Sequence, residues 1–179
     1  KDTTAIYIYV EKIKANRFDG FIGITTNPES KTVITGFLDL QLINAFNKGE
    51  KALIYWKDNG EDQKTISLNL ELPYVFKSSF GWQSSLQILT LKNTFQNTQL
   101  NTNINYYLDF YSKATLGFET TNTTPIAEMN PLIQNSTRNF WNVGYDFQNF
   151  HSRNNTLENI RIQSRYGFGK RKTTTSNLD

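Results

Sequence analysis

The residues of this chain that could do chemistry are acidic and basic side chains placed at alternate positions of extended segments. The acids are Asp39, Glu71, Asp109 and Asp146, and the bases are Arg161 and Arg165. Two carboxylates that share a site could act as general acid and general base. These acids lie on different predicted strands without a nucleophile motif beside them. We therefore interpret all six residues as a polar, ion-paired network.

Other catalytic chemistry has little support in the composition. The chain has no cysteine, which excludes thiol catalysis, disulfides and cysteine-ligated metals. Its one histidine, His151, falls in a polar segment, Asn149 to Asn155, that we predict to be a connection. A solvated turn histidine is the simplest interpretation. We expect no enzymatic activity, no metal and no cofactor.

Residues 99–111 show the pattern that must position the polar side chains. One set of alternate positions is apolar or aromatic and the other is polar, as side chains on the two faces of a β-strand would be. The first set is Leu100, Thr102, Ile104, Tyr106, Leu108 and Phe110, and the second is Asn101, Asn103, Asn105, Tyr107 and Asp109. A strand that crosses a lipid bilayer needs about 9–11 residues, whereas a globular strand has about 5–6. The length therefore favours a transmembrane β-strand.

The same alternation recurs along the chain and predicts an all-β protein built as a meander of hairpins. No apolar i, i+3, i+4 stripe persists, so no helix is predicted. We expect connections that alternate between short and longer, as in barrels with tight turns at one end. The predicted strands are 6–10, 18–26, 33–45, 51–57, 65–72, 82–91, 99–111, 115–120, 140–148 and 160–168, with turns at 27–30, 47–49 and 58–60 and an irregular segment at 121–139.

The composition agrees with a barrel that faces lipid. Hydrophobic residues make up 37% of the 179, but aromatic residues reach 14%, as in barrels with aromatic girdles at both interfaces. No apolar run approaches the about 20 residues of a transmembrane helix. The 19 basic and 16 acidic residues are interspersed and give a net charge of +3. Since they form no basic stripe, nucleic acid is not an expected partner.

Alternation alone leaves another interpretation open. Any antiparallel sheet with one wet face alternates in this way, and a soluble lipocalin-like barrel would put the apolar set inside. Long strands, aromatics near strand ends and charges of both signs on the polar face favour the transmembrane arrangement.

Several segments in order resemble the start of the barrel of the Omp85 superfamily, in its barrel-assembly or two-partner-secretion type. The lead-in Tyr7–Ile13 followed by 17–23 resembles the exit from a periplasmic POTRA domain into the first barrel strand. Residues 36–40 and 44–50 resemble the second strand and its tight turn. Residues 72–76 with 80–81 resemble the next turn, and 145–155 resembles a degenerate later turn.

The resemblance implies a place, partners and a division of the chain. Residues 1–14 would end a POTRA-like domain or form a lead-in strand, and 15–179 would be the N-terminal portion of the barrel, 8–9 of about 16 strands. No signal peptide precedes Lys1, and such barrels have even strand counts. We therefore expect a processed chain, trimmed or part of a larger barrel, in the bacterial outer membrane. Its partners would be membrane lipid, client polypeptides and the remaining strands on the same or another chain.

The implied function is assembly or translocation of proteins through a lateral seam at the first barrel strand. That seam would comprise Phe18, Gly20, Phe21, Ile22, Gly23 and Ile24, and client strands would add to it by β-augmentation. The glycines Gly20 and Gly23 could mark a weak strand or only accommodate curvature. A passive porin-like or structural barrel and a soluble ligand-binding barrel remain the alternatives.

Overall fold

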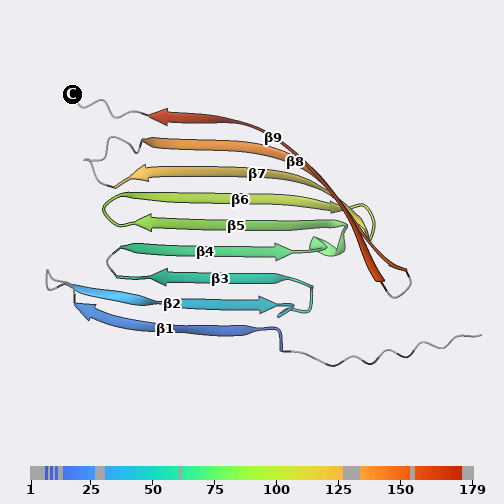
Figure 1. The fold of residues 1–179 in the computed structure, drawn as a ribbon, viewed down its shortest axis with the longest axis horizontal. Helices are drawn as coiled ribbons and strands as arrows, with labels where there is room; N and C mark the ends of the chain where they lie inside the picture. Colours follow the sequence, from blue (N-terminus) through green and yellow to red (C-terminus); the bar gives the residue numbers. More distant parts are fainter. Residues whose placement is uncertain are drawn as a thin grey trace, which may run out of the picture.

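The protein is a single open β-sheet. The computed structural model describes residues 7, 9, 11, 14–26, 31–60, 62–126, 134–153 and 156–174. Within them nine strands form one sheet in chain order, each antiparallel to the next (Figure 1). The strands are β1 Arg17–Thr26, β2 Thr32–Ile43, β3 Lys51–Asp58, β4 Gln63–Leu72, β5 Phe80–Leu91, β6 Phe95–Tyr107, β7 Ser112–Pro125, β8 Asn135–Arg153 and β9 Thr156–Thr174. The predicted all-β meander of hairpins is confirmed, and the open sheet is consistent with part of a barrel.

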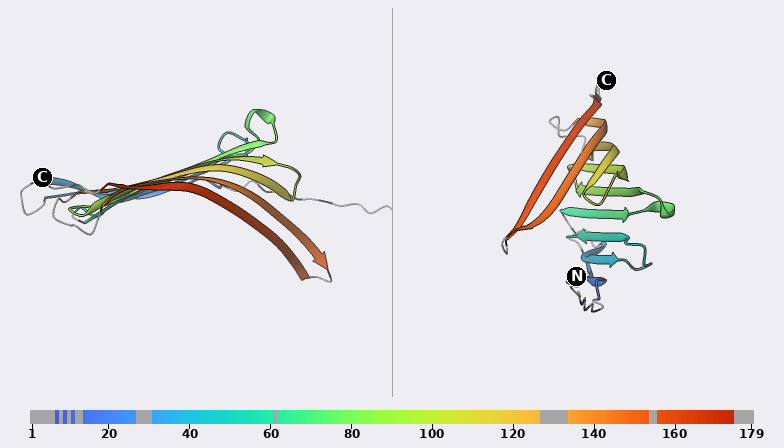
Figure 2. Two further views of the ribbon diagram at one scale, coloured as in Figure 1. Left: turned by 90° about the horizontal axis from the view of Figure 1, so that it is seen from above. Right: turned by 90° about the vertical axis from the view of Figure 1, so that its right-hand side faces the viewer.

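The sheet is twisted and curved (Figure 2). The hairpin of β8 and β9 bends away from the sheet at one end, while the connection between β4 and β5 projects to the opposite side. That connection contains the one helical element of the described residues, the three-residue 3-10 turn η1 Val75–Lys77. Twist and coiling of this kind are what an open antiparallel sheet develops from its right-handed strands.

Directly paired residues share a face, so the register separates two chemistries across the whole sheet. One face, which we call the apolar face, carries the row Leu40, Ile54, Leu68, Leu86 and Leu100 on five successive strands. The other, which we call the polar face, carries the row Lys51, Glu71, Gln83, Asn103, Gly117 and Asn142. The predicted alternation on β2, β4 and β6 therefore matches the two faces of the sheet.

No apolar side chain in the described part of the chain is buried. Ile22 and Ile24 on β1, for example, are 74% and 76% exposed. A sheet with one apolar face normally buries it against a second layer. Here the described residues form one layer only, so the apolar face needs a cover that this layer does not supply.

The prediction of a strand at 99–111 was wrong in its bounds, since β6 begins at Phe95 and ends at Tyr107. The Asp109 carboxylate accepts hydrogen bonds from the backbone N–H groups of Tyr111 and Ser112, both at 2.7 Å, and closes a turn. Asp109 is therefore a turn residue and lies on neither face of a strand. The apolar alternation that misled the prediction continues through this turn.

The predictions for the later strands were too short. Strands β7 and β8 extend through polar segments that the sequence marked as irregular, because threonine and asparagine pair there across three strands, as in Asn122 with Thr137. The segment predicted as irregular is strand as far as Pro125 and again from Asn135. Strand β8 pairs with β9 as far as Arg153 with Thr156, so His151 lies in a strand. Of the turn expected at 145–155, residues 145–153 are strand, and 154–155 lie outside the described residues.

Two smaller expectations also differ. Short and longer connections are not separated between the two ends of the meander, since the short 92–94 and the longer 126–134 lie at the same end. Of the strand predicted at 6–10 only Tyr7 and Tyr9 are described, and neither is in a strand. The turn predicted at 27–30 lies outside the described residues.

The turn between β2 and β3, residues 44–50, is held by one carboxylate. Glu50 is nearly buried, and its two oxygens accept the backbone N–H groups of Phe46 and of Lys48, the latter at 2.9 Å. Asn44 accepts the Gly49 N–H at 2.8 Å. The Phe46 N–H is the main cause that holds the pKa of Glu50 below its usual range, with burial acting in the opposite direction.

We predict that Glu50→Gln lowers the thermal unfolding midpoint at pH 7, because the amide offers one acceptor to two N–H donors. A folded-state pKa below the unfolded value means that this carboxylate stabilises the fold above the unfolded pKa of about 4.3. The stabilisation is lost as the pH falls through the folded pKa, so the difference between wild type and variant should shrink in acid. Unfolding followed by circular dichroism between pH 7 and pH 3 measures this difference.

The control is Lys48→Gln, which leaves both backbone donors in place. The Lys48 charge is the smallest of the causes that lower the pKa of Glu50, so this variant should keep most of the wild-type acid response. A difference between wild type and Glu50→Gln that stays constant across this pH range would contradict the assignment.

Candidate functional site

The first candidate site is the edge strand β1. Within the described residues it pairs only with β2, and β9 pairs only with β8, so both outer edges of the sheet are open. All of the predicted seam residues of β1 are exposed except Gly23, which is half-buried. Phe18, Ile22 and Ile24 lie on the apolar face with Gly20. Phe21 lies on the polar face, edge-on to Phe37 with ring centroids 5.2 Å apart.

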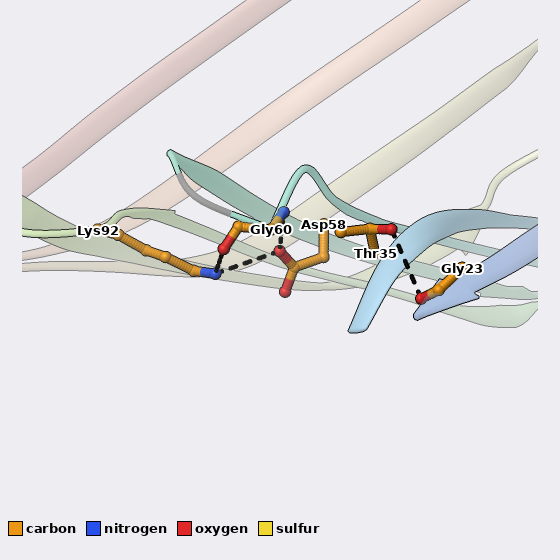
Figure 3. A network of polar contacts seen from close by, with 5 residues as sticks. All are labelled: Gly23, Thr35, Asp58, Gly60 and Lys92. Atoms are coloured by element: carbon orange, nitrogen blue, oxygen red, sulfur yellow. Dashed lines mark hydrogen bonds and ion pairs between the residues drawn. The ribbon is translucent and has the colours of Figure 1, made fainter. Parts of the chain in front are cut away.

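Side-chain bonds hold the beginning of β1 to the end of β2. The Arg17 guanidinium donates to the Asp39 carboxylate at 2.7 Å. The Gln41 amide donates to the Ala15 carbonyl at 3.2 Å, and Asn16 accepts the Ile43 N–H at 2.8 Å. Toward the other end of β1, the side-chain contact among the described residues is the long hydrogen bond of 3.5 Å from the Thr35 hydroxyl to the Gly23 carbonyl (Figure 3). The Arg17 end of β1 is therefore the better anchored end.

Glycines let β1 and β2 approach closely on the apolar face. A Cβ atom at Gly20 would lie 2.6 Å from the Phe37 carbonyl oxygen, and one at Gly36 would lie 2.1 Å from the Phe21 carbonyl oxygen. Gly36 also has φ of +141°, which disfavours other residues. Gly23 differs, because its nearest neighbour is the Thr35 hydroxyl at 3.0 Å. Gly20 is thus a position where the backbones of β1 and β2 approach closely. The two interpretations from the sequence, a weak strand or an accommodation of curvature, did not include such an approach.

The second candidate site is the polar face. Its predicted network consists of separate contacts in the structure. Asp146 pairs with Arg161 at 3.5 Å and accepts a hydrogen bond from Gln163 at 2.9 Å, far along the sheet from the Asp39–Arg17 pair. Arg165 lies opposite Gly144, and no ion pair joins it to a described residue. The six residues are not brought together.

Glu71 lines a shallow groove of about 390 Å³ on the polar face. The groove crosses β3 to β6, and its polar residues are Lys51, Asn69, Glu71, Gln83, Ser84, Ser85, Asn101 and Asn103. Amide groups bond to one another along it, as in the 2.6 Å bond from Asn103 to Asn101. This arrangement suits a wet surface that offers many weak hydrogen bonds.

Beside this groove lie two buried amides that the sequence did not single out. Asn105 is 1% exposed and Asn142 is 8% exposed. Thr115 donates to the Asn105 oxygen at 2.8 Å, but the Asn105 Nδ2 and Asn142 Oδ1 atoms have no hydrogen-bond partner among the described residues. Gly117, which pairs directly with Asn103 and Asn142, leaves space that these two side chains fill. In the sequence each of the two is only an asparagine among alternating polar residues. Many exposed positions carry the same signal, so the sequence does not distinguish the buried ones.

The far end of the sheet carries a compact ion pair. Lys92, between β5 and β6, lies 3.4 Å from Asp58 and donates to the Gly60 carbonyl, while Asp58 accepts the Gly60 N–H at 2.8 Å (Figure 3). The contact ties two neighbouring connections together. It holds the ends of β3 to β6 in register and offers no free group for chemistry.

The described residues hold no group of three or more His, Cys, Asp or Glu side chains arranged to bind a metal. None of their helices has the length and apolarity to cross a membrane.

Comparison with protein-family models, with curated proteins and with solved structures gave no match in any of the three.

We predict that Gly20→Ala destabilises the β1–β2 pair by about 1–3 kcal/mol, because its Cβ must displace the backbone of β2. Gly23→Ala meets only a side-chain hydroxyl and should cost less. Hydrogen exchange of the β1 amides, with the thermal midpoint of the whole protein, measures both effects. Equal protection of β1 in the two variants would show that backbone approach at Gly20 does not matter.

Proposed function

We propose that this chain forms part of the wall of an outer-membrane β-barrel that assembles or translocates proteins through a lateral seam at β1. The observation that carries the proposal is the apolar face, which runs across the sheet without a buried core or a covering layer. A lipid bilayer is a cover that fits a single layer of strands, because each barrel strand puts alternate residues into lipid.

Strand length and the opposite face support the same proposal. Eight of the nine strands have 10 residues or more, enough to cross the hydrocarbon layer when tilted. The polar face, with its amide groove and its separate ion pairs, has the character of a water-filled interior. A soluble ligand-binding barrel would need the apolar face to close around a ligand, and the open sheet gives that alternative no specific support.

Open edges require further strands. In lipid an unpaired strand edge costs several kcal/mol per unsatisfied backbone group. We therefore propose that β1 and β9 meet strands outside this sheet, on the same or another chain. One of those contacts, at β1, would be exchangeable for the strand of a client polypeptide.

The two ends of the proposed seam differ in how firmly β1 is bonded to β2. Its side-chain bonds to β2 gather at the Arg17 end, around Asp39 and Gln41. We propose that β1 shifts more readily at its Thr26 end, where the side-chain contact among the described residues is the long hydrogen bond to the Gly23 carbonyl. A client strand would therefore begin to pair at that end.

Cysteine cross-linking tests the seam. These 179 residues contain no cysteine, so each introduced thiol is the one cysteine within them. We predict that Phe21→Cys and Ile24→Cys in the full-length protein form disulfides with cysteines placed in client strands during assembly. The measurement is the yield of cross-linked product on non-reducing gels.

The matched controls are Asn69→Cys on the polar face and Leu68→Cys on the apolar face of β4, which is paired on both sides. Equal yields at β1 and β4 would reject the seam. A protein that stays folded and soluble in buffer without detergent would reject the membrane wall itself.

A further inference from the structure

We propose that the far ends of β7, β8 and β9 form a binding site on the apolar face for the phosphorylated sugar headgroup of a membrane glycolipid. The inference rests on the proposed function, since it takes the apolar face to contact lipid. It adds a ligand class and a place for it.

Three successive rows on these strands change from aromatic to polar. Phe118, Trp141 and Phe168 are directly paired and form the aromatic row. The next row on the same face is Thr120, Asn139 and Lys170, with a hydrogen bond of 2.6 Å from Thr120 to Asn139. The third row is Asn122, Thr137 and Lys172. Four residues separate the first row from the third, about 13 Å at a strand rise of about 3.3 Å per residue.

The third row borders a hollow of about 480 Å³. It is lined only by hydroxyls, amides and one ammonium group, from Asn122, Thr123, Thr124, Asn135, Ser136, Thr137 and Lys172. Such a lining offers hydrogen bonds to sugar hydroxyls and one fixed positive charge to a phosphate. We call it the polar hollow.

The aromatic row borders a second hollow, of about 1050 Å³, which we call the apolar hollow. Phe118 and Trp141 lie at its border, and Leu72, Trp82, Ile104 and Leu116 supply much of its apolar lining. The two hollows therefore follow one another on the same face. An amphiphile with acyl chains in the apolar hollow and its headgroup in the polar hollow would match both.

Charge favours an anionic headgroup. Among the described side chains of β7, β8 and β9, the apolar face carries Lys170 and Lys172 but no carboxylate. Both lysines are exposed. Because amides and hydroxyls outnumber the cations, the lining suits a phosphorylated sugar better than a bare phosphate ester.

The test uses the full-length protein extracted from its own membranes and washed in detergent. Lipid A that remains bound is measured per protein by mass spectrometry. We expect the double variant Lys170→Gln with Lys172→Gln to retain lipid A about 10- to 30-fold more weakly, since each basic residue near a membrane surface contributes modestly to binding anionic lipid.

The control is Arg138→Gln with Arg171→Gln. These two arginines pair directly with each other at the same level of the sheet but on the polar face. Their loss removes the same charge and should leave retention unchanged. Equal retention by wild type and the lysine variant, or equal loss in both variants, would overturn the proposal.

Reconstitution separates the lipid classes. Wild type in nanodiscs should bind added lipid A and lose that preference in the lysine variant, whereas phosphatidylglycerol should not compete. Competition by phosphatidylglycerol would overturn the glycolipid assignment and leave the membrane wall standing. Failure of the proposed function looks different, because the wild type would then be soluble without detergent and would retain no lipid of either class.

Discussion

The backbone hydrogen-bond ladder between neighbouring strands is the interaction on which this structure depends. In the described residues no apolar side chain is buried, so there is no core to hold the strands together. Each inner strand pairs on both sides along most of its length, and within the described residues only β1 and β9 have a side without a partner strand. A hydrogen bond gains strength where water is excluded. The ladder would therefore be most stable where a lipid layer covers the apolar face.

The same ladder organises the chemistry. Because directly paired residues share a face, the register that aligns Leu40 with Ile54 also aligns Lys51 with Glu71 on the other side. A slip of one residue would exchange the faces of a strand. The turns limit such slips, and Glu50 and Asp109 do so by binding backbone N–H groups in two connections at one end of the sheet.

Much of the sheet could be predicted from alternation alone. Strand β4 is the clearest case, because Ile66, Leu68 and Leu70 alternate with small or polar residues and Pro73 ends the run. The method failed where periodicity and turn chemistry conflict, as at Asp109, whose carboxylate closes a turn inside an alternating run. It also failed on the last part of β7, residues 121–125, since alternation of hydrophobicity cannot reveal a strand segment with two polar faces.

The candidate sites were less accessible to sequence reasoning. Strand β1, the proposed seam, was placed within one residue, but the close approach at Gly20 involves the carbonyl of Phe37, seventeen positions away. The burial of the amides of Asn105 and Asn142 depends on glycines of adjacent strands. These features are set by distances between residues on different strands, which a single sequence does not contain.

The chain order of the strands also bears on how the sheet forms. Every strand pairs with its neighbour in sequence, and no connection crosses the sheet. Each pairing therefore closes only a short loop, which keeps the entropy cost of every step small. Proteins dominated by such local contacts fold faster than sheets with distant pairings. The sheet can consequently form by adding one hairpin at a time to an existing edge.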